Sequence, residues 1–466
     1  MTAPLPLPEL PLEPLVPNFT HSRRSSRILF SVAGLLMFCT LAFGAVNAWG
    51  HFILQTTATV LLAYWALDQM RSARITIRWN PAFPPMIAFA GLMCIQLLPG
   101  VSAYWHATFS QLLLYISYGI LCFLLVQTLS RSRDIRILGT ALAIYGSAVA
   151  LFAILQNLSA PTKLYWLKTP RFGGWIYGPY VNHNHYAGLM EMLVPVPLVF
   201  AFSRFGNQRE RWLAASAAAF MGATIFLSGS RGGMIALAVE FAILLLLLFR
   251  ERQKQNSAIL FGTFLLVALA MIAWTGGHEV KARIATLAGD KHSELATDIR
   301  LQIDRDILRM SRHHLLLGWG QGTFADVYPQ FRSFYTDSLV NAAHNDFLQV
   351  LSETGIIGFG IMLWFLAITI RNALRKSSNW TTDLNGAVAV AALLGISGIL
   401  VHSLVDFNMQ VPANAAIFYS LCTVAAMEPR FRTHSAYIGI ASNSDIFRRR
   451  PTAHLIGRIL STFSVS

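Results

Sequence analysis

The chain has 466 residues, of which 55% are hydrophobic and only 12% are charged, and its mean hydropathy is +0.51. This composition excludes a water-soluble globular domain, because so few charged residues cannot cover the surface of a chain this long. The net charge of +14 does not indicate a nucleic-acid partner, since the Arg and Lys residues lie in short clusters between long apolar segments. We therefore expect the chain to reside in a lipid bilayer and to bind no nucleic acid.

The first 27 residues form a Pro-rich leader that ends in the basic residues Arg23, Arg24 and Arg27. This leader lacks a small-residue cleavage site, and many more apolar segments follow it. We therefore interpret the first apolar segment as a transmembrane helix and not as a removable signal peptide.

Twelve apolar segments have about the length needed to cross a membrane as a helix, which is roughly 20 residues. They predict an all-α fold, namely a polytopic bundle of about 12 transmembrane helices. The segments are 28–48, 51–69, 84–100, 110–130, 136–158, 185–203, 211–229, 232–249, 257–275, 347–370, 386–405 and 413–427.

The distribution of basic residues predicts the orientation of the bundle. Clusters that begin at Arg71, Arg131, Arg204, Arg250 and Arg371 follow every second segment, whereas the connections at 49–51, 101–109 and 406–412 contain no Lys or Arg. Since basic connections favour the cytoplasm, we expect both termini there, in a multi-pass inner-membrane protein.

One outer connection, 276–345, is too long for a plain loop and predicts a small helical periplasmic cap. Within it, Ile299, Ile303, Leu308 and Met310 recur at roughly helical spacing, which indicates an amphipathic helix ending at Gly318. The predicted organisation is a cytoplasmic leader (1–27), transmembrane helices one to nine (28–275), the cap (276–345), helices ten to twelve (346–427) and a cytoplasmic basic tail (428–466).

Two cations oppose this orientation signal. Arg171 lies in the outer connection 159–184, and Arg231 lies in the tight turn "SGSRGGM" at the outer membrane boundary. Because a cation there works against insertion, we expect both arginines to have a functional use. The alternative is an Arg side chain that merely anchors a helix end.

Five stretches that carry unusual polar residues converge on the same predicted face, as an active site between helices requires. Arg side chains suit bidentate binding of phosphate, and His344 is suited to act as a neutral base oriented by Asn345 or Asp346. No spacing typical of metal ligands stands out, so we expect a metal-independent reaction without a cofactor. The candidate residues are Arg171, Asn182, Asn184, His185, Arg231, Arg300, His344, Asn345, Asp346, His402, Asp406 and Asn408.

Several of these polar residues also have a purely structural interpretation. Asn345 or Asp346 suits the N-cap of the helix that follows, and His183 and His185 suit packing or capping at a helix start. Glu191 and Glu240 lie inside apolar segments, where carboxylates can mark a proton pathway, so a transporter or flippase remains an alternative. A non-catalytic scaffold ranks last, because it would not need cations at both Arg171 and Arg231.

Four motifs, "SGSRGG", "GWGQGTFADVYPQF", "AHNDFLQVLSETGIIGFG" and "HSLVDFNMQVPANA", resemble in order and spacing those of the O-antigen ligase and polysaccharide polymerase family of bacterial inner membranes. The resemblance covers roughly 165–425. It implies an inverting, metal-independent glycosyltransferase that takes a glycan from undecaprenyl diphosphate at the periplasmic face. The acceptor would be lipid A-core in a ligase, another lipid-linked repeat in a polymerase, or a protein hydroxyl in related enzymes.

The resemblance also assigns roles by position. The family histidine matches His344, which would activate the acceptor hydroxyl, and the phosphate-binding arginines best match Arg171 and Arg300. Arg231 matches a further motif residue that would position the diphosphate or hold the helix pair. The family often has an aromatic residue where this chain has Asp304, so Arg305 and Arg309 remain alternatives to Arg300.

Overall fold

The computed structural model describes residues 23–71, 77–170, 175–250, 297–335 and 340–429. Every regular element in these ranges is a helix, and β-pairing within them consists of two isolated bridges, Leu164 with Lys168 and Tyr177 with Tyr180. The all-α expectation is therefore confirmed for this part of the chain. The expected helix at 257–275, the start of the cap, most of the leader, most of the tail and Arg171 lie outside the described residues.

The helices follow the apolar segments closely, except that Pro195 divides the expected helix at 185–203 into α6 and α7. In chain order the helices are α1 (Arg23–Leu41), α2 (Ala48–Arg71), α3 (Phe83–Gln96), α4 (Trp105–Thr128), α5 (Ser132–Ser159), α6 (His183–Leu193), α7 (Pro195–Phe202), α8 (Gln208–Ser228), α9 (Arg231–Arg250), α11 (Thr297–His313), α12 (Phe324–Val327), α13 (Asp346–Lys376), α14 (Leu384–His402) and α15 (Pro412–Ala426). Single 3-10 turns occur at η1 (Phe43–Ala45), η2 (Tyr328–Gln330) and η3 (Asn408–Gln410).

Seven of the described helices are long and apolar enough to cross a membrane, counting α6 and α7 as one. The other six are α4, α5, α8, α9, α13 and α14, whereas α3, α15 and the apolar part of α1 (Ser25–Leu41) are shorter. The chain is thus a multi-pass membrane protein. The total of about 12 helices and the cytoplasmic location of both termini remain predictions.

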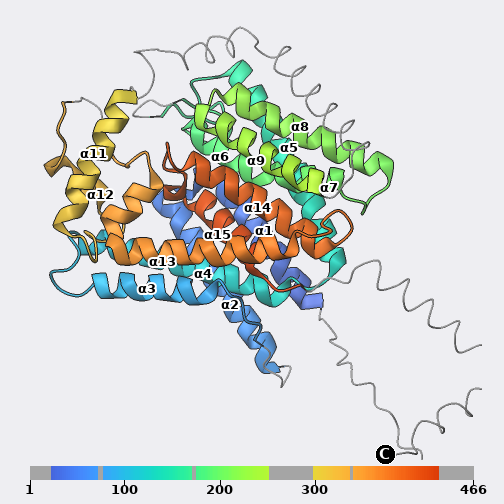
Figure 1. Cartoon of the computed structure of the whole chain (residues 1–466), viewed down its shortest axis with the longest axis horizontal. Coiled ribbons are helices and arrows are strands. Elements are labelled where there is room, and N and C mark those ends of the chain that lie inside the picture. Colours follow the sequence, from blue (N-terminus) through green and yellow to red (C-terminus); the bar gives the residue numbers. More distant parts are fainter. Residues whose placement is uncertain (1–22, 72–76, 171–174, 251–296, 336–339, 430–466) are drawn as a thin grey trace, which may run out of the picture.

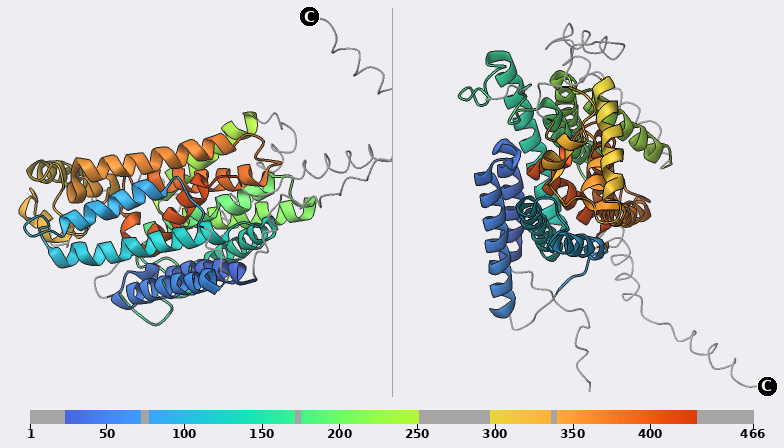
Figure 2. Two further views of the ribbon diagram at one scale, coloured as in Figure 1. Left: turned by 90° about the horizontal axis from the view of Figure 1, so that it is seen from below. Right: turned by 90° about the vertical axis from the view of Figure 1, so that its left-hand side faces the viewer.

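The long helices lie side by side along the longest axis of the molecule, and α11 and α12 lie at one end of the bundle (Figures 1 and 2). The connections that the charge pattern assigns to the outer face contact one another. The Ala103 amide donates to the Trp319 carbonyl oxygen at 2.8 Å, and Gly44, in the turn η1 that ends the expected helix 28–48 early, packs against Tyr180 and Val411. Ala103 and Trp319 lie at the cap end, because Trp319 comes just after the turn that follows α11.

Expected inner connections also contact one another. The Ser26 hydroxyl at the start of α1 donates to Asp134 at the start of α5 at 2.9 Å, and Lys376 at the end of α13 donates to the carbonyl oxygen of Met427 after α15. These contacts agree with the two groups of connections that the charge pattern predicts. Which group faces the periplasm remains a prediction.

A kink in α13 anchors the cap. Gly355 has a φ of +64°, and a Cβ atom there would lie 2.3 Å from the carbonyl oxygen of Leu316. The amide of Ile356 instead donates to the Leu315 carbonyl at 2.9 Å, and the amide of Gly320 donates to the Glu353 carbonyl at 2.9 Å. Backbone groups that a straight helix would use internally are thus satisfied by the cap.

The amphipathic helix of the cap is confirmed as α11, but two details of its prediction are wrong. The helix ends at His313 and not at Gly318, because the chain turns through 314–317 to reach the kink in α13. Its buried face carries Ile303, Ile307 and Met310, whereas Leu308 is 44% exposed.

Candidate functional site

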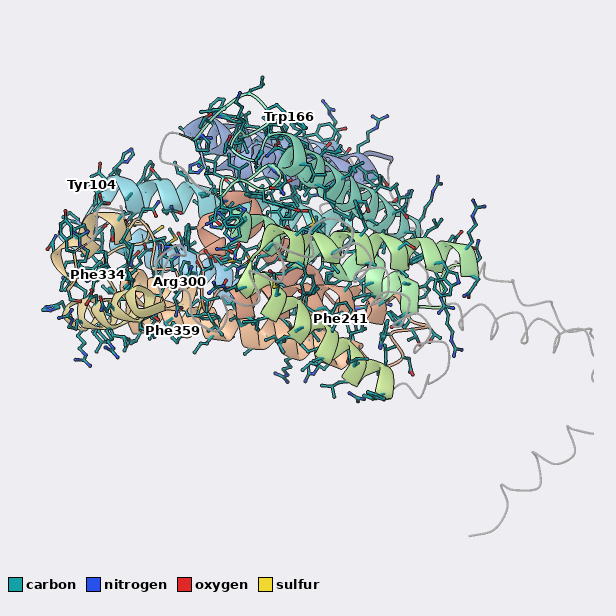
Figure 3. All side chains as sticks on the ribbon, turned by 90° about the horizontal axis from the view of Figure 1, so that it is seen from above. Tyr104, Trp166, Phe241, Arg300, Phe334 and Phe359 are labelled. Atoms are coloured by element: carbon teal, nitrogen blue, oxygen red, sulfur yellow. The ribbon has the colours of Figure 1, made fainter. Side chains whose placement is uncertain are left out.

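The candidate residues meet where α11 reaches the connection between α14 and α15. Nη1 of Arg300 donates a hydrogen bond to the Val405 carbonyl oxygen at 2.9 Å, and Figure 3 shows Arg300 beside the bundle near the cap. The Nε atom of Arg300 is buried and has no hydrogen-bond partner among the described residues. The guanidinium therefore retains donor capacity for an anion.

His344 precedes Asn345, the N-cap residue of α13, and has a left-handed backbone conformation, with φ at +53°. Few residues other than glycine adopt this conformation, and such strain often occurs at functional sites. Its imidazole packs edge-on against Phe407, with ring centroids 4.8 Å apart. Nδ1 is buried and has no hydrogen-bond partner within the described ranges.

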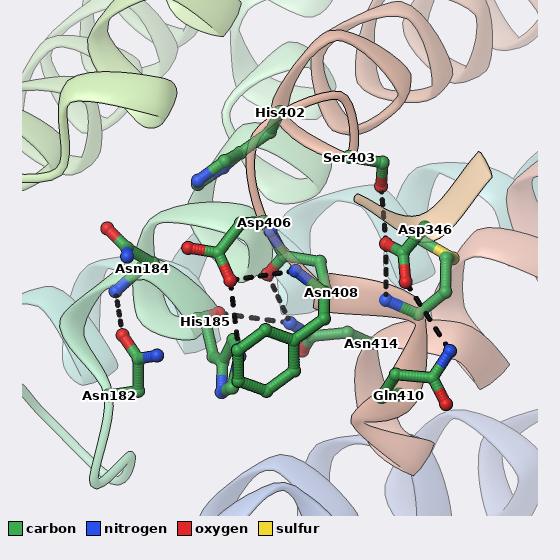
Figure 4. Close-up of polar contacts among 12 residues, drawn as sticks. Asn182, Asn184, His185, Asp346, His402, Ser403, Asp406, Asn408, Gln410 and Asn414 are labelled. Carbon is green, nitrogen blue, oxygen red and sulfur yellow. Dashed lines mark hydrogen bonds and ion pairs between the residues drawn. The ribbon is translucent and has the colours of Figure 1, made fainter. Parts of the chain in front are cut away.

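His185 on α6 also packs against Phe407, with ring centroids 4.7 Å apart. Its Nε2 atom lies 3.8 Å from Oδ1 of Asp406, and its carbonyl oxygen accepts from Nδ2 of Asn414 at 3.0 Å. These contacts are part of the network in Figure 4. One phenylalanine ring thus positions two histidines from distant parts of the chain.

The charges of this cluster follow from burial and from the neighbouring side chains. Burial lowers the pKa of His344 to about 4, with Arg300 acting in the same direction and Asp406 opposing it. Burial alone would raise the pKa of Asp406, but His185, His402 and His344 together lower it below its usual value. At neutral pH, His344 is therefore an uncharged imidazole beside an ionised Asp406.

The asparagines at two helix starts act as N-caps. Asn182 accepts from the Asn184 amide at 2.8 Å at the start of α6, and Asn345 accepts from the Leu348 amide at 3.2 Å at the start of α13. Capping was the structural interpretation of Asn345, and it is confirmed. The substrate-binding roles expected for Asn182, Asn184 and Asn345 remain predictions.

Asp346 and Asn408 hold the connection after α14 in place. The buried Asp346 carboxylate accepts from the Ser403 hydroxyl at 2.8 Å and from the Met409 amide at 3.1 Å (Figure 4). Asn408 is fully buried, and its Oδ1 atom accepts from Asn414 at 3.4 Å. Both residues lie beside the histidine cluster, and their expected contacts with substrate remain predictions.

A buried pair links α6 to α14. Nδ1 of His402 lies 2.8 Å from Oε1 of Glu191, and both side chains are almost completely inaccessible. Nε2 of His402 lies 3.5 Å from the hydroxyl of Ser230, which accepts from the amide of Gly233 and so caps α9. Arg231 is the first residue of α9 and is half-buried.

The structure thus brings together most of the residues expected at the site, while Arg171 lies outside the described residues. The two alternatives to Arg300 are both exposed, namely Arg305 and Arg309. Arg309 also forms an ion pair with Asp306 within the cap. Among the described residues, no group of three or more His, Cys, Asp and Glu side chains is arranged to hold a metal ion.

Sequence reasoning missed Phe407, Ser230 and the pairing of Glu191 with His402. Phe407 and Ser230 lie within motifs that were recognised, but a motif does not reveal which side chain packs against which. The glycines after Arg231 were the available signal, because two adjacent glycines at a helix start suggest a close neighbour.

Comparison with known families adds an independent finding. Residues 216–365 match the sequence model of the family described as O-antigen ligase (Wzy_C). The matched segment contains Arg231, Arg300 and His344, which lie on or beside α9, α11 and α13. No curated protein matches the chain. The match of this segment to the family model supports membership of the chain in the O-antigen ligase and polymerase family.

Proposed function

We propose that the protein is a periplasmic-face glycosyltransferase that moves a glycan from undecaprenyl diphosphate to an acceptor hydroxyl. Its partners would be the lipid-linked glycan donor, the bilayer and an acceptor that is a glycolipid, a glycan or a protein. The preferred acceptor is lipid A-core, as in an O-antigen ligase. A repeat-unit polymerase and a protein O-oligosaccharyltransferase are the alternatives within the family.

The observation that carries this proposal is the meeting of Arg300 and His344 at the connection that bears Val405 and Asp406. A guanidinium with unused donors supports binding of the diphosphate, and a neutral imidazole supports proton abstraction. Both groups are needed in the same place if a phosphate leaving group is to be displaced by a hydroxyl.

The proposed reaction is a direct displacement that inverts the anomeric carbon. The acceptor oxygen forms a bond to the anomeric carbon as the bond from that carbon to the phosphate oxygen breaks. Undecaprenyl diphosphate leaves with the electron pair, and its charge is stabilised by Arg300 and Arg231. The hydroxyl proton passes to His344, which later releases it to water. The proposed reaction requires no metal ion.

The transporter alternative rested on Glu191 and Glu240 as isolated carboxylates within the membrane. Glu191 is instead paired with His402, beside the turn that contains Arg231. This pairing associates Glu191 with the candidate site and favours the transferase over a separate proton pathway.

A reconstituted assay tests the proposal. The purified chain in proteoliposomes would be supplied with a glycan on undecaprenyl diphosphate and, separately, with lipid A-core, with more donor or with a protein acceptor. We expect transfer to one acceptor, with His344→Ala inactive and His106→Ala, an exposed histidine at the start of α4, fully active. Full activity of His344→Ala would refute the proposed base.

A further inference from the structure

The pair formed by Glu191 and His402 lies against the backbone that immediately follows Arg231. A Cβ atom on Gly232 would lie 2.5 Å from Cδ2 and 2.7 Å from Nε2 of His402. A Cβ atom on Gly233 would lie 3.0 Å from Oε1 of Glu191. A side chain on Gly232 would therefore collide with the imidazole, and a side chain on Gly233 would collide with Ala187, Ile225 and the Glu191 carboxylate.

Stability alone does not explain this pair. Taking a carboxylate and an imidazole out of water carries a desolvation cost, and apolar residues of similar volume often pack at least as well. Both side chains are almost completely inaccessible, so neither presents a surface to a substrate. Any effect of the pair on a substrate is therefore exerted through its neighbours.

The neighbours of His402 connect the two candidate phosphate-binding arginines. On one side, its ring contacts Gly232 and lies 3.5 Å from Ser230, the residues that flank Arg231. On the other side, its carbonyl oxygen accepts from the amide of Val405 at 3.0 Å, and the Val405 carbonyl accepts from Arg300 at 2.9 Å. His402 thus contacts both the turn that contains Arg231 and the backbone of Val405, to which Arg300 donates its hydrogen bond.

We propose that Glu191 and His402 are positioning residues, which hold the first turn of α9 against the connection after α14 and so fix the spacing between Arg231 and Arg300. The two guanidinium groups are then preorganised to bind one diphosphate. This inference rests on the proposed function, because it takes undecaprenyl diphosphate as the ligand of both arginines. It gives His402 a role through Arg231, without contact to the substrate.

Binding of undecaprenyl diphosphate to the full chain in nanodiscs gives the direct test. Glu191→Leu removes the acceptor for Nδ1 of His402 and should weaken binding about tenfold or more. Glu191→Gln retains an oxygen that accepts from the imidazole and should restore most of the affinity. In steady state, Glu191→Leu should raise the KM for the donor more than it lowers kcat. Equal affinities for Glu191→Leu and wild type would overturn the inference.

Glu240→Leu is the matched control, because it makes the same substitution at another buried carboxylate. Glu240 is a completely buried carboxylate on α9, but it packs against Gly398 and not against the turn that contains Arg231. We expect Glu240→Leu to bind undecaprenyl diphosphate as wild type does. If this variant loses as much affinity as Glu191→Leu, burial of a carboxylate matters and not the contact with His402, so the positioning role is refuted. Thermal unfolding of each variant establishes that the comparison is made on folded protein.

A double-mutant cycle tests the contact with the turn. Gly232→Ala puts a methyl group where the imidazole lies, and His402→Ala empties that space. If both changes act by displacing the same turn, their effects should not add up. The double variant should then bind undecaprenyl diphosphate at least as tightly as the more impaired of the two single variants. Losses of affinity that simply multiply would mean that the two residues act independently, which contradicts the inference.

The outcomes separate this inference from the proposed function. Wild type that binds undecaprenyl diphosphate but transfers no glycan to any acceptor would refute the proposed function while leaving the positioning role standing. Wild type that transfers glycan, together with unimpaired binding in His402→Ala and Glu191→Leu, would refute the positioning role alone.

Discussion

Nη1 of Arg300 hydrogen-bonds to the carbonyl oxygen of Val405, so the cap is joined to the connection between α14 and α15. Arg305 lies on the same helix, α11, but its side chain is exposed. We therefore expect Arg300→Ala to raise the KM for the lipid-linked donor by roughly 10- to 150-fold, because a charge-assisted hydrogen bond to phosphate contributes about 1.5–3 kcal/mol. Arg305→Ala should leave the KM unchanged, and the reverse ranking would reassign the phosphate contact.

Replacement of His344 should mainly affect kcat. Loss of a general base typically slows a reaction by about 10²–10⁴-fold, so we expect His344→Ala to lower kcat by this amount while donor binding is retained. Measurement of undecaprenyl diphosphate affinity alongside single-turnover transfer distinguishes the two effects. A variant with unchanged kcat and weakened binding would make His344 a ligand of the donor and not a base.

The pH dependence of transfer follows from the lowered pKa of His344. Only the neutral imidazole accepts a proton, and burial lowers the pKa from 6.5 to about 4. The value of kcat/KM should therefore stay level as the pH falls through 6.5 and decline only near pH 4. Bound diphosphate would raise the pKa of the imidazole, so the acidic decline of kcat should occur at higher pH than that of kcat/KM. A midpoint of kcat/KM at 6.5 would contradict the assignment.

Gly355 should be intolerant of a side chain. Gly355→Ala requires a left-handed backbone and brings a Cβ atom to 2.3 Å from the Leu316 carbonyl oxygen, so we expect a loss of about 1–3 kcal/mol in unfolding free energy. Gly360 on the same helix has open space around its Cβ position, so Gly360→Ala should be neutral or mildly stabilising. Thermal unfolding in detergent compares the two variants, and equal melting temperatures would count against the strain.

Chelation tests the proposed independence from metal ions. Transfer by the reconstituted chain should continue at the same rate after treatment with excess EDTA, because arginine side chains are proposed to stabilise the leaving diphosphate. Abolished transfer that returns on addition of a divalent ion would mean that a metal takes part.

The sequence predicted the helices well because hydropathy reports burial in lipid directly. The segment 110–130, for example, corresponds to α4 (Trp105–Thr128). The end of α11 was less predictable, since Leu315 and Leu316 continue the apolar pattern although their carbonyls bond to α13. The kink at Gly355 was unpredictable for the same reason. It depends on contact between segments that are distant in the chain, and the local sequence pattern does not reveal that contact.

The site was predictable in its residue types but not in its pairings. His344 was proposed as a base from its residue type, and Arg300 was chosen among the arginines of the cap because of the motifs that resemble the O-antigen ligase and polymerase family. Glu191 also stood out, yet its sequence position suggested a proton pathway. Its partner lies on α14, 211 residues away, and only the packing of α6 against α14 brings the two together.

The absence of a side chain at Gly232 couples two positions that lie far apart in the chain. Any homologue with a larger residue at this place must give up the imidazole at position 402 or shift the helix that starts at Arg231. Substitutions at the two places should consequently be correlated, and libraries that randomise both together should recover functional combinations that neither single library contains.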